Sequence, residues 1–182
     1  WSDVFGALDG ARRSTVTARP AVADLTIGYR VPEPILVAAN RLLGRTGVDA
    51  TASRSVRDVG APPAHHRVGR GDDLASAVAG VVADVKHRHR LTGVVAPLAR
   101  HDDITAAFAD RGFTTVDHLH DLAATDVPLF GPEAVKGLEF DGVVIVAPDE
   151  IDDGSARGAR LMYVAMTRAV QELAIVEHAS PA

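Results

Sequence analysis

Hydrophobic and polar positions along this chain follow two patterns, one typical of buried strands and one typical of amphipathic helices. Short apolar runs bounded by turn residues predict strands, while apolar residues at every third or fourth position predict helices. The predicted strands are residues 24–28, 65–69, 91–97, 113–119, 127–130, 142–148 and the last part of 161–177. The predicted helices are residues 1–13, 31–45, 72–90, 101–112 and the first part of 161–177.

This alternation of strand and helix is sustained from residue 24 to 178. It predicts an α/β fold in which a mainly parallel sheet carries helices on both faces. Residues 45–63 are polar, end in a Pro62-Pro63 pair and are predicted to form a loop. In such a fold ligands bind beside the loops that follow the carboxyl ends of the strands. Tyr29 and Arg30 follow the first predicted strand, so we expect them at that edge.

The composition indicates an ordinary globular domain, because 47% of the 182 residues are apolar and 24% are charged. A dedicated nucleic-acid-binding domain is usually basic, whereas the formal net charge here is −5. The chain has no cysteine, which excludes disulfides and thiolate metal sites and suits a cytoplasmic location. No apolar run is long enough to span a membrane, so no membrane association is expected. The chain opens at Trp1 without an initiator Met, and we expect it to be one domain of a longer protein.

Motifs that would mark a complete nucleotide or metal site are missing from the sequence. Neither the phosphate-binding loop GxxxxGK(S/T) nor the dinucleotide motif GxGxxG occurs. The eight histidines include local pairs, but there is no HExxH motif and no carboxylate spacing completes a metal site. We therefore expect no metal site, and no triphosphate cradle made by this chain alone.

Four residues nevertheless suit one side of a nucleotide site. Arg30, after a strand, and Arg168, near the end of a predicted helix, each offer a planar fork of donors to a phosphate. Tyr29 offers a ring on which a base can stack, and Glu139 can accept a hydrogen bond from a sugar hydroxyl. The alternative is structural, because an arginine at a helix end complements the helix dipole and Tyr29 can lie at the edge of a core. The residues by themselves leave both interpretations open.

Three segments resemble motifs of UvrD/Rep-type superfamily 1 helicases, and they occur in the order of that family. LTIGYRVPEPIL (25–36) is similar to motif IV, VKGLEFDGVVIV (135–146) to motif V and LMYVAMTRAVQEL (161–173) to motif VI. The resemblance implies that residues 1–182 form a single RecA-like domain of the P-loop NTPase type. This would be the second motor domain (2A) of such an ATPase.

The resemblance also implies roles for five residues. Arg30 and Arg168 would contact the γ-phosphate of ATP, with Arg168 as the arginine finger, and Tyr29 would stack on adenine. Glu139, with Gly137 beside it, would bind near the ribose and couple the nucleotide state to domain movement. A first motor domain (1A), N-terminal to this chain, would supply the phosphate loop and hold Mg²⁺. The 182-residue chain alone is therefore expected to be inactive.

Two departures from the family narrow the expected function. Only two strand–helix units separate Arg30 from Lys136, which leaves no room for the large 2B insertion of those helicases. Residues 131–134 read Gly-Pro-Glu-Ala, where the family usually carries a threonine and a histidine that grip single-stranded DNA. Both departures resemble the HelD-type branch of actinobacteria, whose members release RNA polymerase from nucleic acid. The alternatives are the 2A domain of an ATP-dependent DNA repair helicase and a non-catalytic protein-interaction domain.

Overall fold

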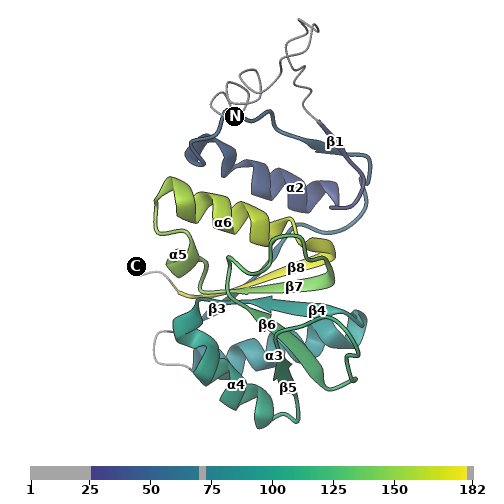
Figure 1. The fold of residues 1–182 in the computed structure, drawn as a ribbon, viewed down its shortest axis with the longest axis vertical. Helices are drawn as coiled ribbons and strands as arrows, with labels where there is room; N and C mark the ends of the chain where they lie inside the picture. Colours follow the sequence, from purple (N-terminus) through teal and green to yellow (C-terminus); the bar gives the residue numbers. More distant parts are fainter. Residues whose placement is uncertain (1–25, 70–72, 180–182) are drawn as a thin grey trace, which may run out of the picture.

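A six-stranded parallel sheet forms the centre of the molecule (Figure 1). The structure is a computed structural model that describes residues 26–69 and 73–179, so the helix expected over 1–13 lies outside the described residues. The strands stand in the order β3-β8-β7-β4-β6-β5, and every neighbouring pair is parallel. Their bounds are β3 (Ala64–Val68), β4 (Thr92–Val95), β5 (Thr114–Val116), β6 (Asp126–Phe130), β7 (Phe140–Val146) and β8 (Ala169–His178). The predicted parallel sheet is confirmed.

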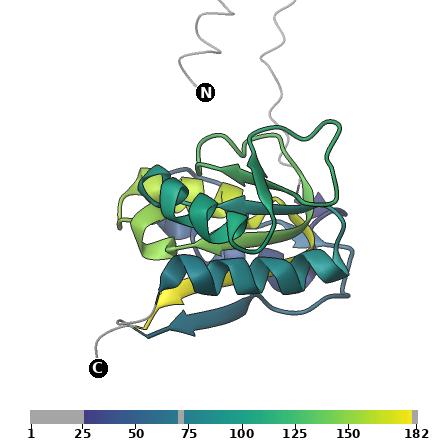
Figure 2. The ribbon, with the colours of Figure 1, turned by 90° about the horizontal axis from the view of Figure 1, so that it is seen from below.

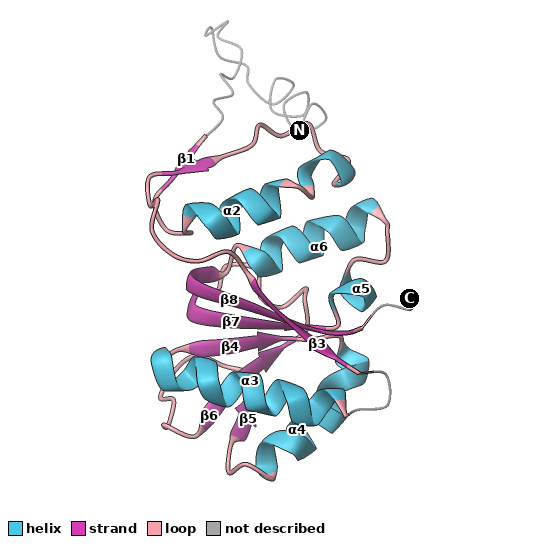
Figure 3. Ribbon diagram, turned by 180° about the vertical axis from the view of Figure 1, so that it is seen from behind, coloured by secondary structure: helices cyan, strands magenta, loops and turns pink. Residues whose placement is uncertain are grey.

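Helices cover both faces of this sheet, also as predicted. One face packs against α3 (Leu74–Arg88) and α4 (His101–Ala109), which lie side by side (Figure 2). The other face packs against α6 (Ala156–Met166) and the short α5 (Pro148–Ile151), and α2 (Glu33–Asn40) packs on α6 from the side away from the sheet (Figure 3). Two layers of apolar side chains therefore hold the sheet between them.

The central strand β7 shows why an uninterrupted apolar run correctly predicted a buried strand. Val144 and Val146 pack toward α3, while Val143 and Ile145 pack toward α6, and all four are fully buried. A strand buried on both faces has no polar face to alternate with, so its sequence reads as one apolar run. This burial fixes the register of β7, and with it the position of the residues that precede the strand.

The first predicted strand does not join the sheet, which corrects the sequence-based expectation. β1 (Ile27–Gly28) pairs instead with β2 (Arg54–Ser55) in a separate two-stranded parallel ladder. This ladder packs on α2, on the far side of α6 from the sheet (Figure 1). Ile27 is 67% exposed, so the segment lacks the apolar surface that would place it in a buried sheet. The predicted loop 45–63 accordingly contains a strand.

Several helix boundaries differ from those that hydrophobic periodicity predicts. α6 begins five residues before the predicted start at 161, because the Ser155 side chain accepts a hydrogen bond of 2.9 Å from the Gly158 amide and caps the helix. The first turn of this helix is polar, so hydrophobic periodicity did not predict it. The helix predicted over 31–45 ends at Asn40 and is followed by a 3₁₀ turn (Leu43–Arg45). Another 3₁₀ turn (Leu98–Arg100) leads into α4.

A charged cluster joins the end of α3 to strand β8. Arg88 donates to both carboxylate oxygens of Glu172, from Nε at 3.0 Å and from Nη2 at 2.7 Å. His89 Nε2 lies 2.8 Å from Glu172 Oε2. The hydrogen bonds from Arg88 lower the pKa of Glu172, His89 adds to this effect, and burial opposes it. The folded state therefore favours the ionised carboxylate.

We expect Glu172→Gln to lower the free energy of unfolding at pH 7 by about 1.5–3 kcal/mol, the usual contribution of hydrogen bonds to a charged group. Because the pKa of Glu172 is lowered on folding, its stabilisation is present above the unfolded pKa of about 4.5 and is lost as the pH falls through the folded value. Thermal unfolding of both proteins across this pH range measures the difference. Glu177→Gln is the matched control on β8, since Glu177 forms a looser pair with Arg67 at 3.6 Å. Equal unfolding curves of wild type and Glu172→Gln at pH 7 would contradict the expectation.

Candidate functional site

Glu139 and Arg168 lie next to each other at the amino edge of the sheet. Glu139 directly precedes β7, and Arg168 directly precedes β8, the parallel neighbour of β7. The Phe140 amide donates to the carbonyl of Arg168 at 3.0 Å, and Phe140 pairs with Ala169 in the strand register. Two residues that are far apart in the sequence are thus fixed side by side by backbone hydrogen bonds. Arg168 was expected late in a helix, but α6 ends at Met166 and Arg168 lies in the turn that follows.

Arg168 is half-buried and its guanidinium is held at three points. Nε donates to the carbonyl of Val164 at 3.1 Å, Nη1 to the carbonyl of Leu138 at 3.1 Å, and Nη2 to the hydroxyl of Thr167 at 3.3 Å. Burial lowers the pKa of Arg168, and the nearby charge of Arg30 lowers it further. Both effects mean that the positive charge lacks compensation, so an anion placed here would stabilise it.

Arg30 also lies at this edge, where it forms an ion pair with Glu139. This corrects the expectation that Tyr29 and Arg30 mark the carboxyl ends of the main strands. The expectation failed because it assumed that the first strand belongs to the sheet, whereas β1 pairs only with β2. The side chains of Arg30 and Glu139 are 64% and 40% exposed, so an incoming ligand can reach both.

Tyr29 and Gly137 complete the set of five predicted residues. Tyr29 is 74% exposed, and its ring is therefore open to a stacking partner. Gly137 has φ of +86°, in the left-handed region that side chains avoid, and the Leu138 amide donates to the Val135 carbonyl across this turn at 3.1 Å. The turn explains the glycine without reference to a ligand, and it leads the chain directly to Glu139.

Arg57 belongs to the same region, although the sequence gave no signal for it. Its Nη1 donates to the carbonyl of Arg30 at 2.6 Å and to the carbonyl of Val170 at 2.7 Å. Arg57 lies in the polar segment 45–63, where neither periodicity nor a motif singles out any residue. Only the folded chain reveals that this segment contacts the start of β8.

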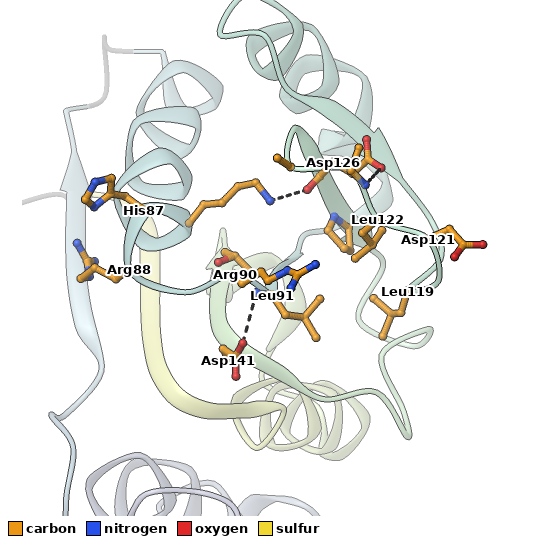
Figure 4. Close-up of a pocket in the computed structure, with 14 residues that line it drawn as sticks. His87, Arg88, Arg90, Leu91, Leu119, Asp121, Leu122, Asp126 and Asp141 are labelled. Carbon is orange, nitrogen blue, oxygen red and sulfur yellow. Dashed lines mark hydrogen bonds between the residues drawn. The ribbon is translucent and has the colours of Figure 1, made fainter.

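A cavity of about 970 Å³ lies at the amino ends of β4 and β6 (Figure 4). None of the five predicted residues lines it. Two of its charged side chains already have backbone hydrogen-bond partners: Lys86 Nζ donates to the carbonyl of Asp126 at 2.7 Å, and Asp141 accepts from the Leu91 amide at 3.4 Å. Burial lowers the pKa of Lys86, and Asp126 opposes this shift. The wall carries both cationic and acidic side chains, and thus shows no preference for an anion.

Within residues 26–69 and 73–179, no group of three or more histidine, aspartate or glutamate residues is arranged to hold a metal ion. No helix within the same residues is long and apolar enough to cross a membrane.

Comparison with known proteins finds a family match over one segment of the chain. Residues 133–176 match the UvrD-like helicase C-terminal domain, a segment that includes Glu139 and Arg168. A search of curated proteins found no match. Among solved structures, the chain resembles the C-terminal domain of a possible DNA helicase from Lactobacillus plantarum WCFS1, with a TM-score of 0.62 and 21% identity. That alignment covers 84% of this chain and 89% of the other, and at this identity it establishes a shared fold.

Proposed function

We propose that this chain is the second motor domain of a cytoplasmic, superfamily 1 helicase-like ATPase. It completes an ATP site whose phosphate loop and Mg²⁺-binding acids belong to a partner domain. One observation carries the proposal: three hydrogen bonds hold Arg168 beside Arg30 and Glu139. Arg168 and Glu139 lie within the segment that matches a helicase domain, and Arg30 contacts that segment through Glu139. A fixed arginine with uncompensated charge is what stabilises a transferring phosphoryl group.

Each residue of the edge then has a role in the shared site. Arg168 stabilises the charge that develops on the γ-phosphate, and Arg30 binds the same phosphate from the exposed side. When a phosphate engages Arg30, Glu139 loses its ion pair with Arg30. Its carboxylate then accepts a hydrogen bond from the ribose. In this way the presence of the γ-phosphate changes the contacts at the start of β7.

The test of this proposal is ATP binding by a Tyr29 variant of the full-length protein. Stacking of a base on an aromatic ring contributes about 1–3 kcal/mol, so we expect Tyr29→Ala to raise the Kd for ATP by roughly tenfold. Tyr29→Phe keeps the ring and should bind normally. Leu98→Ala is the control, because Leu98 is 75% exposed but follows β4 at the opposite edge of the sheet. Equal Kd values for wild type and Tyr29→Ala would argue against adenine stacking.

We further propose that the motor acts by releasing RNA polymerase from nucleic acid. The supporting observation is the segment between β6 and β7, where Glu133 is exposed and forms an ion pair with Arg157. Gly131 is buried, and a Cβ there would lie 3.1 Å from the Leu98 side chain. Because Arg157 is already paired with the Glu133 carboxylate, this pair offers no free cation to a phosphate backbone, which disfavours a grip on single-stranded DNA. Co-purification of the full-length protein with core RNA polymerase supports release, whereas duplex unwinding without polymerase affinity supports a DNA helicase.

A further inference from the structure

We infer that Arg57 is a positioning residue that sets Arg30 and Tyr29 relative to Arg168. This inference rests on the proposed function, since the two arginines must reach one phosphate. The supporting observation is that one nitrogen atom of Arg57 hydrogen-bonds to both segments and so bridges them. Arg57 Nη1 carries two hydrogens, and it donates to the carbonyl of Arg30 and to that of Val170, two residues after Arg168.

The base of the Arg57 side chain is itself fixed by the first turn of α2. The carbonyl of Arg57 accepts from the Glu33 amide at 2.8 Å, and its own amide donates to Ser55 Oγ at 3.0 Å. The Ser55 amide in turn donates to Glu33 Oε2 at 2.5 Å. The side chain therefore extends from a rigid backbone, which a positioning residue requires.

The segment that Arg57 holds has little other support. Tyr29 and Arg30 lie in a bend between the two-residue strand β1 and helix α2, and both are exposed. The ladder that contains β1 is not part of the main sheet. The ion pair between Arg30 and Glu139 is exposed, and such pairs usually contribute little. The bond from Arg57 to Val170 is partly buried, and together with the bond to the Arg30 carbonyl it links the bend to β8.

The bridge makes a distinctive prediction about conservative replacements. A lysine ammonium also carries several hydrogens on one nitrogen, so Arg57→Lys can donate to both carbonyls. Arg168 differs, because three separate nitrogens bind three separate oxygens, and lysine cannot reproduce that arrangement. Rescue by lysine is therefore expected at position 57 and not at position 168.

ATP hydrolysis by full-length Arg57→Met, Arg57→Lys and Arg168→Ala variants tests the inference. We expect Arg57→Met to lower kcat by about 100-fold, the cost of a misplaced reacting group, with a change of only a few-fold in KM. Arg57→Lys should stay within about tenfold of wild type. Arg67→Met is the matched control, since Arg67 lies on β3 and its side chain is 73% exposed. Unchanged kcat in Arg57→Met, with Arg168→Ala inactive, overturns the inference; so does a lysine variant as impaired as Arg57→Met.

Hydrogen exchange keeps the inference testable if Arg168→Ala hydrolyses ATP normally and the proposed function fails. In the full-length Arg57→Met protein, we expect the amides of Glu33 and Val56, which donate to the carbonyls of Arg57 and Gly28, to exchange faster while those of β7 and β8 keep their protection. Unchanged exchange of these two amides would overturn the positioning role. A uniform rise of exchange through β7 and β8 would also overturn it, because Arg57 would then stabilise the whole fold.

Discussion

Arg168→Ala is expected to reduce ATP hydrolysis by the full-length protein by about 10³- to 10⁵-fold, the contribution of arginine fingers in related chemistry. Binding of ATP should be affected far less, because the positive charge acts on the phosphoryl group during transfer. In the structure Arg168 is already held by Val164, Leu138 and Thr167, so no reorganisation is needed before the reaction. Turnover under saturating ATP, together with a separate binding titration, measures the two effects.

The same variant removes hydrogen bonds to two backbone carbonyls, so loss of folding must be separated from loss of chemistry. A melting temperature within a few degrees of wild type, with ATP still bound, identifies a catalytic defect. Arg157→Ala is the matched control, because Arg157 lies at the start of α6, the helix that precedes Arg168, and pairs with Glu133. Normal turnover by Arg168→Ala would refute the assignment of an arginine finger.

Gly93→Ala is expected to destabilise the fold by about 1–3 kcal/mol, the usual cost of forcing an extra carbon into a packed core. Gly93 lies in the middle of β4, and a Cβ there would approach the Phe140 ring to 2.5 Å. Phe140 is fully buried and packs near Phe130, with ring centroids 6.2 Å apart. The ring therefore has no free space in which to retreat.

Chemical denaturation measures this loss, and a domain of this size should also melt about 2–4 °C lower for each kcal/mol. Gly44→Ala is the control, since a Cβ at Gly44 meets no atom within 4 Å and its backbone is not left-handed. Gly93→Ala has a second expected effect, on ATP binding. Because Phe140 directly follows Glu139, displacement of the ring should also weaken ATP binding. Equal stability of Gly93→Ala and Gly44→Ala would show that the core accommodates the added methyl group.

The sequence predicted the central strands of the sheet well because they are buried on both faces. β7 and β4 read as unbroken apolar runs, and no competing interpretation fits such a run between turn residues. The same rule failed at Ile27, where a short apolar segment forms an exposed ladder. Burial depends on the whole fold, and the sequence of such a short segment does not show whether it will be buried.

The sequence singled out candidate site residues but did not predict where in the fold they lie. Arg168 and Glu139 stood out because they flank apolar elements within recognisable motifs. The edge of the sheet at which Arg30 lies depends on strand pairing, which local sequence does not encode. Arg57 was not predictable for a similar reason, since its two acceptors are backbone carbonyls that any residues could supply.

The hydrogen bond between the Phe140 amide and the Arg168 carbonyl has a mechanical consequence. Glu139 and Arg168 extend from the starts of two adjacent strands, and adjacent strands keep a spacing of about 4.8 Å. The backbones of Glu139 and Arg168 therefore keep a fixed separation. In the proposed motor, a nucleotide that pulls on one of these residues also pulls on the other. In this motor, force from the γ-phosphate is therefore expected to move the domain as a whole relative to its partner domain.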